Sequence, residues 1–240
     1  MDSNLTDKVA VISGASHGLG QAVAQDLAAR GVHVVMIARG QERLRQAADS
    51  IRESGGAATV MPCDVSDVAQ VRKAAAEVQR RFDAVHILVN NAGIPAPRSF
   101  VETDFNDWDT VIGINLSGVF YLTRALWDCL LRADSAYVIN ISGTAGTRGG
   151  GSPAYGSAKF GLTGLNHAVA LAGKEHNIRS TILYPGGMDT GWRGAPIGEM
   201  PRSETMDPAE VARFIAQLVS SPPEFVVNEA VLNPLDQPYM

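Results

Sequence analysis

Apolar runs of strand length alternate along the chain with longer stretches that have helical periodicity. Seven runs are predicted as strands: 8–13, 32–38, 57–62, 85–90, 136–142, 178–184 and 225–232. Six stretches are predicted as helices: 19–30, 41–54, 68–82, 108–131, 155–175 and 208–219. The chain is therefore expected to alternate between strand and helix over its whole length.

The predicted strands are short, almost wholly apolar and separated by helices. Such strands are buried on both faces, which is typical of a parallel sheet with right-handed crossovers. The pattern predicts an α/β fold, a doubly wound three-layer sandwich around a seven-stranded parallel sheet. Ligands of such sheets bind outside the carboxyl ends of the strands, so functional residues are expected directly after each strand.

Length and composition narrow the class of protein. The 240 residues, 45% hydrophobic and 19% charged, are expected to form one globular domain, residues 1–240. The net charge is −5 and no block of Lys and Arg occurs, which disfavours nucleic acid and membranes as partners.

Cys63 and Cys129 have no metal-ligand spacing, so both are interpreted as buried residues and no metal site is expected. The polar amino terminus is followed at once by a strand, a pattern unlike a signal peptide, so the expected compartment is the cytoplasm.

One long irregular stretch, 186–206, follows the sixth predicted strand. A loop of this length in a compact domain is more often a functional lid than a simple connection. Its apolar side chains are candidates for a substrate wall and its arginines for contacts with a substrate carboxylate; the alternative is that these arginines are solvated. The apolar candidates are Met188, Trp192, Met200 and Met206, and the arginines are Arg193 and Arg202.

A glycine-rich turn, Ser13-Gly-Ala-Ser-His-Gly-Leu-Gly20, joins the first predicted strand to the first helix. Its glycines let the backbone turn tightly, approach a pyrophosphate and pack the helix on the sheet, while the free amides at the helix start face the anion. The spacing is GxxxGxG, and the position after the first strand of an alternating chain favours a dinucleotide over a purely structural turn. The predicted binding residues of this turn are Gly14, Ser16, His17, Gly18, Leu19 and Gly20.

The residue that ends the second predicted strand indicates which dinucleotide binds. A carboxylate there would bond a ribose 2′-hydroxyl and repel a 2′-phosphate, but the chain has Ala38-Arg39. The guanidinium of Arg39 suits a phosphate, and His17 could add to it, so NADP(H) is favoured over NAD(H). The alternative is that Arg39 is a solvated loop residue.

Tyr155 and Lys159 are four residues apart in a predicted helix and share one of its faces. A phenol has a pKa of about 10, and a nearby ammonium favours its anion, so such a tyrosine can act as an acid or base near neutral pH. Ser142 ends the fifth strand at the carboxyl edge, where its hydroxyl could bond a substrate oxygen. Asn115 stands among apolar neighbours in a long predicted helix, and packing or a helix kink is its alternative role.

With these residues the sequence resembles the short-chain dehydrogenase/reductase family of the classical type over nearly the whole chain. The motifs that carry the resemblance are Gly14-Ala-Ser-His-Gly-Leu-Gly20, Asp64-Val65, Asn90-Asn-Ala-Gly93, Asn115, Tyr155xxxLys159 and Pro185-Gly186 with Thr190. The resemblance implies a Rossmann-type fold in which Asp64 and Val65 border the adenine. It also implies that Asn90 to Gly93 steady the sheet and the cofactor, with Asn91, Ala92 and Gly93 as cofactor-binding residues, and that Pro185, Gly186 and Thr190 lie along the nicotinamide.

The resemblance further implies a catalytic tetrad of Asn115, Ser142, Tyr155 and Lys159. Tyr155 would give a proton to the carbonyl oxygen, and Lys159 would lower the tyrosine pKa and bond the nicotinamide ribose. Ser142 would hold the substrate oxygen, and Asn115 a water. One departure from the family pattern leaves the position of the catalytic serine undecided. The family has a serine pair after the fifth strand, and alignment from the strand puts Gly143 at the position of the catalytic serine. The thirteen-residue interval counted back from Tyr155 points to Ser142 instead, with Thr144 as a substitute hydroxyl.

The predicted function is hydride transfer between a nicotinamide cofactor and a carbonyl or alcohol, as NADPH-dependent reduction of a ketone, an aldehyde or a 3-oxo or hydroxy acid. The alternative is an NADP(H)-binding sensor or scaffold with an impaired active site, and an epimerase or dehydratase is conceivable on the same fold. A homodimer or homotetramer is expected by analogy with the family. Its interface would use Gly156, Gly161 and Gly164, although core packing explains the same glycines.

Overall fold

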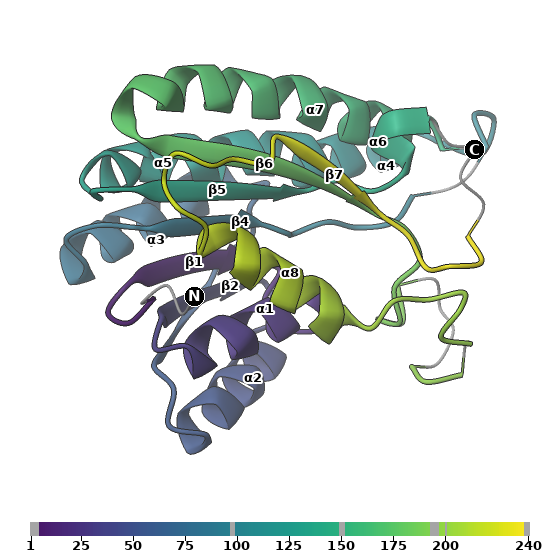
Figure 1. The fold of residues 1–240 in the computed structure, drawn as a ribbon. Helices are drawn as coiled ribbons and strands as arrows, with labels where there is room; N and C mark the ends of the chain where they lie inside the picture. The colour runs from purple at the N-terminus through teal and green to yellow at the C-terminus, as the bar shows by residue number, and fades with distance from the viewer. Residues whose placement is uncertain (1–4, 97–98, 149–151, 193–196, 200, 238–240) are drawn as a thin grey trace.

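The computed structural model describes residues 5–96, 99–148, 152–192, 197–199 and 201–237. Its centre is one parallel sheet of seven strands in the order β3-β2-β1-β4-β5-β6-β7 (Figure 1). The strands are β1 (Val9–Ser13), β2 (His33–Ala38), β3 (Ala58–Pro62), β4 (Ile87–Asn90), β5 (Ala136–Ile141), β6 (Ile178–Pro185) and β7 (Glu229–Leu232). The predicted doubly wound fold is confirmed, and the order reverses direction between β1 and β4.

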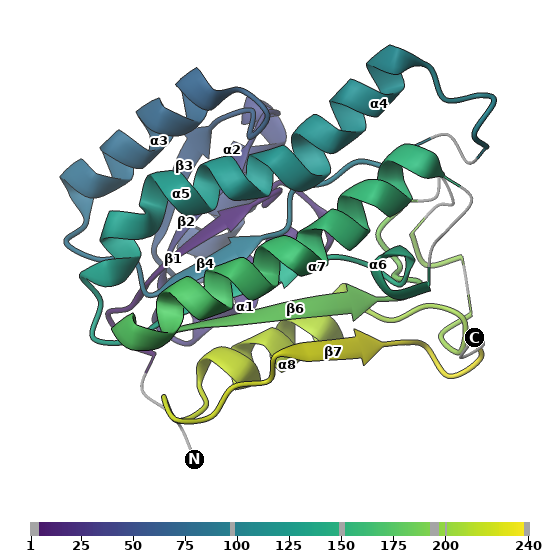
Figure 2. The same ribbon diagram turned by 90° about the horizontal axis from the view of Figure 1, so that it is seen from above.

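Helices cover both faces of the sheet, as Figure 2 shows from above. The face with α1, α2 and α8 has one hydrophobic core, and the face with α3, α5 and α7 has the others. The helices are α1 (Gly18–Ala29), α2 (Gln41–Glu53), α3 (Val68–Arg81), α4 (Phe105–Ile112), α5 (Gly118–Leu131), α6 (Ala145–Arg148), α7 (Pro153–Gly173) and α8 (Pro208–Val219). Two short elements complete them, the π-helical segment η1 (Gly113–Ser117) and the 3-10 turn η2 (Lys174–His176). In the part of the chain that is described, no helix is long and apolar enough to cross a membrane.

Every residue of β1 and β5 is buried, as expected for strands covered on two faces. The last strand is shorter than predicted and begins at Glu229 instead of residue 225. Arg179 explains the difference, because its guanidinium donates to the carbonyl oxygens of Ser221, Pro222 and Phe225. These bonds hold residues 221–225 in a turn, and the strand starts only after it.

Helix starts also differ from their predicted positions. The helix predicted over 108–131 begins at Phe105, where Asp104 forms a capping box with Asp107, and η1 divides it into α4 and α5. The helix predicted from Tyr155 begins at Pro153, after Ser152, whose hydroxyl accepts from the Tyr155 amide. Proline fits the first helical position because an N–H there would have no acceptor within the helix, so none is lost.

Candidate active site at the carboxyl edge of the sheet

The turns after β1, β4, β5 and β6 meet at the carboxyl edge of the parallel sheet, to which the arrows in Figure 1 point. The order reverses between β1 and β4, and this is where open α/β sheets form their ligand crevice. Nearly all the predicted site residues lie at this edge. Asp64, Val65 and Arg39 lie after β3 and β2 on one side of it.

Glycine is required in the turn after β1. Gly14 has a φ of 65° and Gly18 a φ of 57°, a left-handed conformation that side chains rarely adopt. A Cβ on Gly20 would lie 2.3 Å from the carbonyl oxygen of Gly14, so the helix packs against the turn at a distance that only glycine permits. The predicted roles of these glycines in turning and close packing are visible in the backbone.

The start of α1 is suited to an anion. His17 is its N-cap residue but gives no side-chain hydrogen bond to the first turn, and its ring nitrogen lies 3.1 Å from the Ser16 hydroxyl. By contrast, Asp67, Asp104, Ser152 and Asp207 cap α3, α4, α7 and α8 with side-chain oxygens. The first amides of a helix lack acceptors within it, so α1 keeps donors that a pyrophosphate can use. The residues present therefore fit a dinucleotide.

The segment after β4 fastens this turn. The Ser13 hydroxyl accepts from the amides of Asn91 and Ala92, both at 3.0 Å. In return the Asn91 side chain donates to the carbonyl oxygens of Ser13 and Gly14. Predicted binding residues from two segments about eighty residues apart in sequence are thus joined into one rigid turn.

At the other side of the crevice, Arg39 follows β2 and Asp64 follows β3. The Arg39 guanidinium lies 3.8 Å from the Asp64 carboxylate, and 60% of the Arg39 side chain is exposed. Asp64 also accepts from the amide and hydroxyl of Ser66, which orients its carboxylate. Val65 is buried, and Gly118 of α5 approaches it so closely that a Cβ there would lie 2.8 Å from Val65. Val65 therefore anchors the segment that follows β3.

Tyr155 and Lys159 are brought together on one face of α7. The Lys159 ammonium nitrogen lies 5.5 Å from the centre of the Tyr155 ring and donates to the Ile141 carbonyl oxygen at 2.9 Å. Lys159 is only 4% exposed. Burial, which disfavours its charged form, lowers the pKa of Lys159 from 10.5 to about 7. A negative charge nearby, such as a phenolate, would favour the charged ammonium form and raise this pKa again.

Asn115 lies in η1 and is completely buried. Its side-chain oxygen accepts from the Ile94 amide, and its side-chain nitrogen donates to the carbonyl oxygens of Ile94 and Val111. It also contacts Gly93, where a Cβ would lie 2.7 Å from its oxygen. One amide hydrogen bond of Asn115 therefore holds the turn after β4 and the other goes to α4. Its implied role in holding a water stays a prediction.

The structure does not direct the Ser142 hydroxyl at Tyr155. The Ser142 hydroxyl donates to the Lys159 carbonyl oxygen at 3.3 Å and is buried beside Gly146, where a Cβ would lie 2.4 Å from the hydroxyl oxygen. Gly143 faces Tyr155 instead, since a Cβ there would lie 3.3 Å from the phenol oxygen. This geometry does not support the role implied for Ser142, because its side chain points to the backbone of α7.

The loop after β6 begins against the crevice. Gly186 donates to the Leu232 carbonyl oxygen, and the Thr190 side chain lies 3.2 Å from where a Cβ on Gly18 would be. Trp192 is similarly placed 3.5 Å from a Cβ on Gly93. Thr190, one of the residues predicted to lie along the nicotinamide, therefore rests on the glycine turn, and Trp192 rests on the turn after β4.

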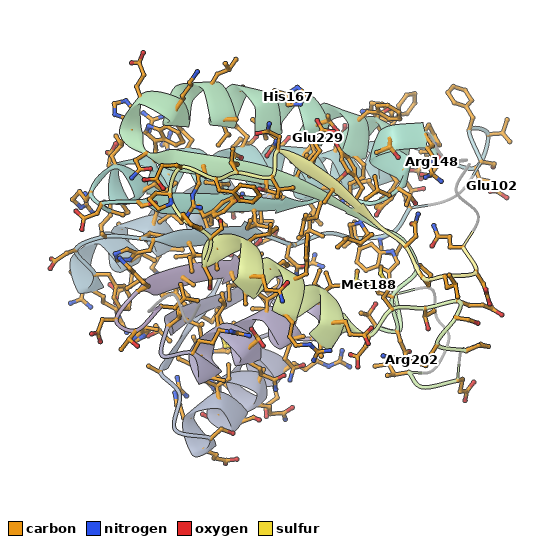
Figure 3. The ribbon with its side chains drawn as sticks, in the orientation of Figure 1. Glu102, Arg148, His167, Met188, Arg202 and Glu229 are labelled. Atoms are coloured by element: carbon orange, nitrogen blue, oxygen red, sulfur yellow. The ribbon has the colours of Figure 1, made fainter. Side chains whose placement is uncertain are left out.

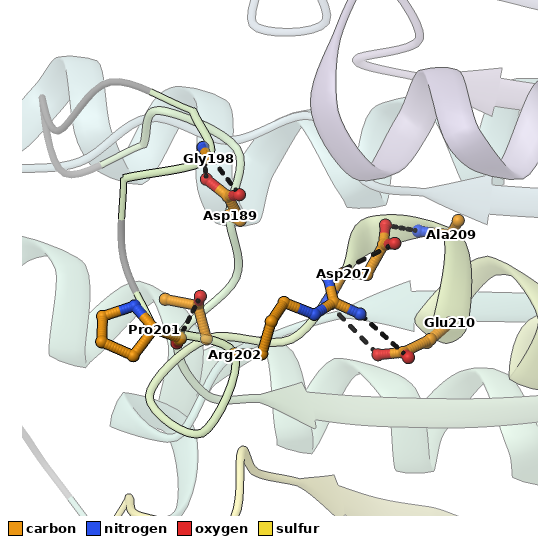
Figure 4. Close-up of polar contacts among 8 residues, drawn as sticks. Asp189, Gly198, Pro201, Arg202, Asp207, Ala209 and Glu210 are labelled. Carbon is orange, nitrogen blue, oxygen red and sulfur yellow. Dashed lines mark hydrogen bonds and ion pairs between the residues drawn. The ribbon is translucent and has the colours of Figure 1, made fainter.

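Several candidate lid residues already have partners within the protein. Met188 and Met206 form a β-bridge with each other and pack, partly buried, against the core near α8. Arg202 pairs with Asp207 and Glu210 (Figures 3 and 4). Contacts of these residues with a substrate stay predictions. Arg193 and Met200 lie outside the described residues.

One contact of this loop was not predicted. The side-chain oxygen of Gln237, near the carboxyl terminus, accepts from the Gly187 amide at 2.8 Å. The Asp236 amide also donates to the Ser203 carbonyl oxygen at the other end of the loop. No local pattern indicates such contacts, because they join segments that meet only after β7 is placed beside β6.

The sheet order and the uncapped glycine-rich helix start define a dinucleotide-binding α/β protein. Comparison with known proteins identifies its family: residues 8–196 match the short chain dehydrogenase family. The 3-oxoacyl-[acyl-carrier-protein] reductase of Escherichia coli (strain K12) is 28% identical over 237 residues, covering 95% of this chain and 96% of that enzyme.

Solved structures agree with this match. An alcohol dehydrogenase from Thermococcus sibiricus, complexed with 5-hydroxy-NADP, superposes with a TM-score of 0.90 at 28% identity, covering 97% of this chain and 99% of that one. A metagenomic short-chain oxidoreductase in complex with NADP gives a TM-score of 0.85 at 29% identity, covering 97% and 99%. The chain belongs to the short-chain dehydrogenase family. It is an NAD(P)-dependent oxidoreductase that acts on a carbonyl or hydroxyl group.

Proposed function

We propose that the protein reduces a ketone, an aldehyde or a 3-oxo acid with NADPH, using Tyr155 as the proton donor. The observation that carries this proposal is the pairing of Tyr155 with the buried Lys159 at the same sheet edge as the uncapped start of α1. Relatives with related activities include the 3-oxoacyl reductase and the alcohol dehydrogenase described above.

The proposed roles follow from the contacts. Tyr155 gives its phenol proton to the substrate oxygen, and the ammonium of Lys159, close to the same ring, stabilises the phenolate that remains. Asn115 fixes the position of Ile94 and thereby the turn that lines the crevice. Bound NADPH supplies the hydride, while the protein provides position and charge.

The proposed cofactor residues are those of the turns described above. The uncapped start of α1 would hold the pyrophosphate through Gly18, Leu19 and Gly20, with Ser16 and His17 beside it. Further contacts are assigned to Gly14, Asp64, Val65, Asn91, Ala92, Gly93, Pro185, Gly186 and Thr190. Tyr155 and Lys159 would also face the nicotinamide ribose.

Arg39 supports the choice of NADP(H) over NAD(H). It is exposed beside the start of α2, where the N-cap Gly40 has no side chain to occupy the first amides. A guanidinium and free amides both suit a 2′-phosphate. The Arg39→Asp variant should therefore lose far more affinity for NADPH than for NADH in fluorescence titrations, and an equal loss for both would contradict the assignment.

The remaining proposals concern the whole molecule. Residues 1–240 form one domain, and the loop 186–206 acts as the substrate lid. Exposed aromatic side chains on α4, α5 and α7 favour a dimer or tetramer; they are Phe105, Trp108, Phe120 and Phe160. Light scattering of the purified protein measures its oligomeric state.

The two free, buried cysteines fit a reducing compartment such as the cytoplasm.

A coupled absorbance assay tests the activity with aldehydes, ketones and hydroxy acids, each with both cofactors. The Tyr155→Phe variant should lose about a hundredfold or more in kcat, while its affinity for NADPH should change far less. A Tyr155→Phe variant with the kcat of the wild type would exclude Tyr155 as the proton donor. Saturable NADPH binding without turnover of any carbonyl would instead favour the sensor alternative.

A further inference from the structure

We infer that Gly143, and not a serine, occupies the point of the active site that faces the reacting oxygen, so that neither Ser142 nor a side chain at position 143 shares this oxygen with Tyr155. The inference rests on the proposed function. It starts from the 3.3 Å separation between the Tyr155 phenol oxygen and a Cβ built on Gly143. A side chain at this position would lie against the proton donor, and glycine leaves that space to the substrate.

The neighbouring hydroxyl of Ser142 is used inside the protein. It donates to the Lys159 carbonyl oxygen, and the residue is only 4% exposed. The Ser142 amide also donates to the Leu183 carbonyl oxygen of β6. Ser142 therefore joins β5 to α7 and β6, and it supports the backbone of the helix that carries Tyr155 and Lys159.

The backbone at this corner is built for glycine. Gly143 has a φ of 153°, outside the range that side chains commonly adopt. Its carbonyl oxygen accepts from the Gly146 amide at 2.8 Å, and the next amide, of Thr144, donates to the Pro185 carbonyl oxygen. Together with the bond from the Ser142 amide to Leu183, these bonds hold the backbone before and after Gly143, and a serine could not be accommodated without moving this corner.

The consequence concerns substrate choice. Because Gly143 itself places no side chain against the Tyr155 hydroxyl, a substituent on the carbonyl carbon can occupy the space at Gly143. Gly143 would then determine specificity in favour of ketones over aldehydes, and it would do so by steric room instead of by a hydrogen bond. Filling the space with a methyl group should harm ketones most.

Two variants test this inference with acetaldehyde, butanone and acetophenone as probes and NADPH as cofactor. In Gly143→Ala, kcat/KM should fall by about tenfold or more for the ketones, and less for acetaldehyde, with NADPH affinity retained. Gly55→Ala is the matched control, because Gly55 also has a positive φ, 84°, but nothing lies within 4 Å of its Cβ position. A Gly143→Ala enzyme with unchanged kcat/KM for all three probes would overturn the inference.

The second variant, Ser142→Ala, separates the two candidate positions. Its kcat should fall by less than about threefold, whereas a hydrogen bond to the reacting oxygen is worth far more. The phenolate absorbance of Tyr155, isolated by subtracting the spectrum of Tyr155→Phe, should titrate as in the wild type. A large loss of kcat with normal NADPH binding, or a shifted Tyr155 titration, would restore Ser142 to the reacting centre. The titration needs no turnover, so it judges the inference even if the wild type reduces none of the probes and the proposed function fails.

Discussion

The turn after β1 and the loop after β6 lie at the same edge of the sheet, yet different contacts hold them in place. In the turn, glycines pack against backbone atoms, and the Asn91 side chain bonds two carbonyl oxygens of the turn. In the loop, a backbone bridge joins Met188 to Met206, and single side chains add bonds to the backbone, such as Asp189 on the Gly198 amide (Figure 4) and Gln237 on the Gly187 amide. The part that must present amides to an anion is rigid, and the part that must admit a substrate depends on contacts that can break individually.

The largest effect should come from the turn. Gly20→Ala places a methyl group 2.3 Å from the Gly14 carbonyl oxygen, and backbone cannot move aside as a side chain can. We expect a loss of about 3 kcal/mol in the free energy of unfolding and loss of NADPH binding, measured by urea denaturation and fluorescence titration. Gly164→Ala is the control, since that helical glycine has open space around it. It should keep the stability of the wild type or slightly exceed it.

Lys159, between the two regions, should make stability depend on pH. Burial holds its pKa at about 7 in the folded protein against 10.5 for the ordinary side chain. Below pH 7 the folded state carries a buried ammonium, whereas above pH 10.5 the side chain is neutral in both states, so its contribution to stability rises between these values. Lys159→Met should therefore exceed the wild type in stability most below pH 7 and least near pH 10.5. A difference in unfolding free energy that is constant with pH would contradict this.

The loop should respond more weakly. Gln237→Ala removes the acceptor of the Gly187 amide, so we expect a loss of about 1 kcal/mol and faster hydrogen exchange at that amide. The KM for NADPH should rise more than kcat falls, because the change acts through the position of the loop. Gln237→Glu keeps an acceptor and should restore exchange protection. Asp236→Ala is the matched control, since Asp236 contacts the loop through its backbone amide.

The smallest effect is expected at the outer side of the loop. Arg202→Ala removes ion pairs with Asp207 and Glu210, but 57% of the Arg202 side chain is exposed. Exposed ion pairs contribute little to stability, so the free energy of unfolding, measured by thermal denaturation, should fall by less than about 1 kcal/mol. In high salt, which screens these pairs, the substitution should no longer change the melting temperature. A larger loss than that of Gln237→Ala would reverse the order proposed for the two contacts.

The sequence by itself determined the layers, the phosphate turn and the pairing of Tyr155 with Lys159. Each depends on local information: apolar runs of strand length, glycine where φ is positive, and two side chains one helical turn apart. Most strand boundaries moved by only one or two residues, and the largest change is before β7, where the distant residue Arg179 holds the chain in a turn.

Only the tertiary structure decided which way the polar side chains point. Ser142 has the right interval from Tyr155, but the backbone of α7 takes its hydroxyl, and Arg202 is engaged by Asp207 and Glu210 beside it. Gln237 reaches Gly187 because β7 pairs with β6 in parallel, which brings the chain end to the crevice. Spacing along the chain sets which positions share an edge or a face. The direction of a side chain there depends on which partners from other segments come within hydrogen-bonding distance.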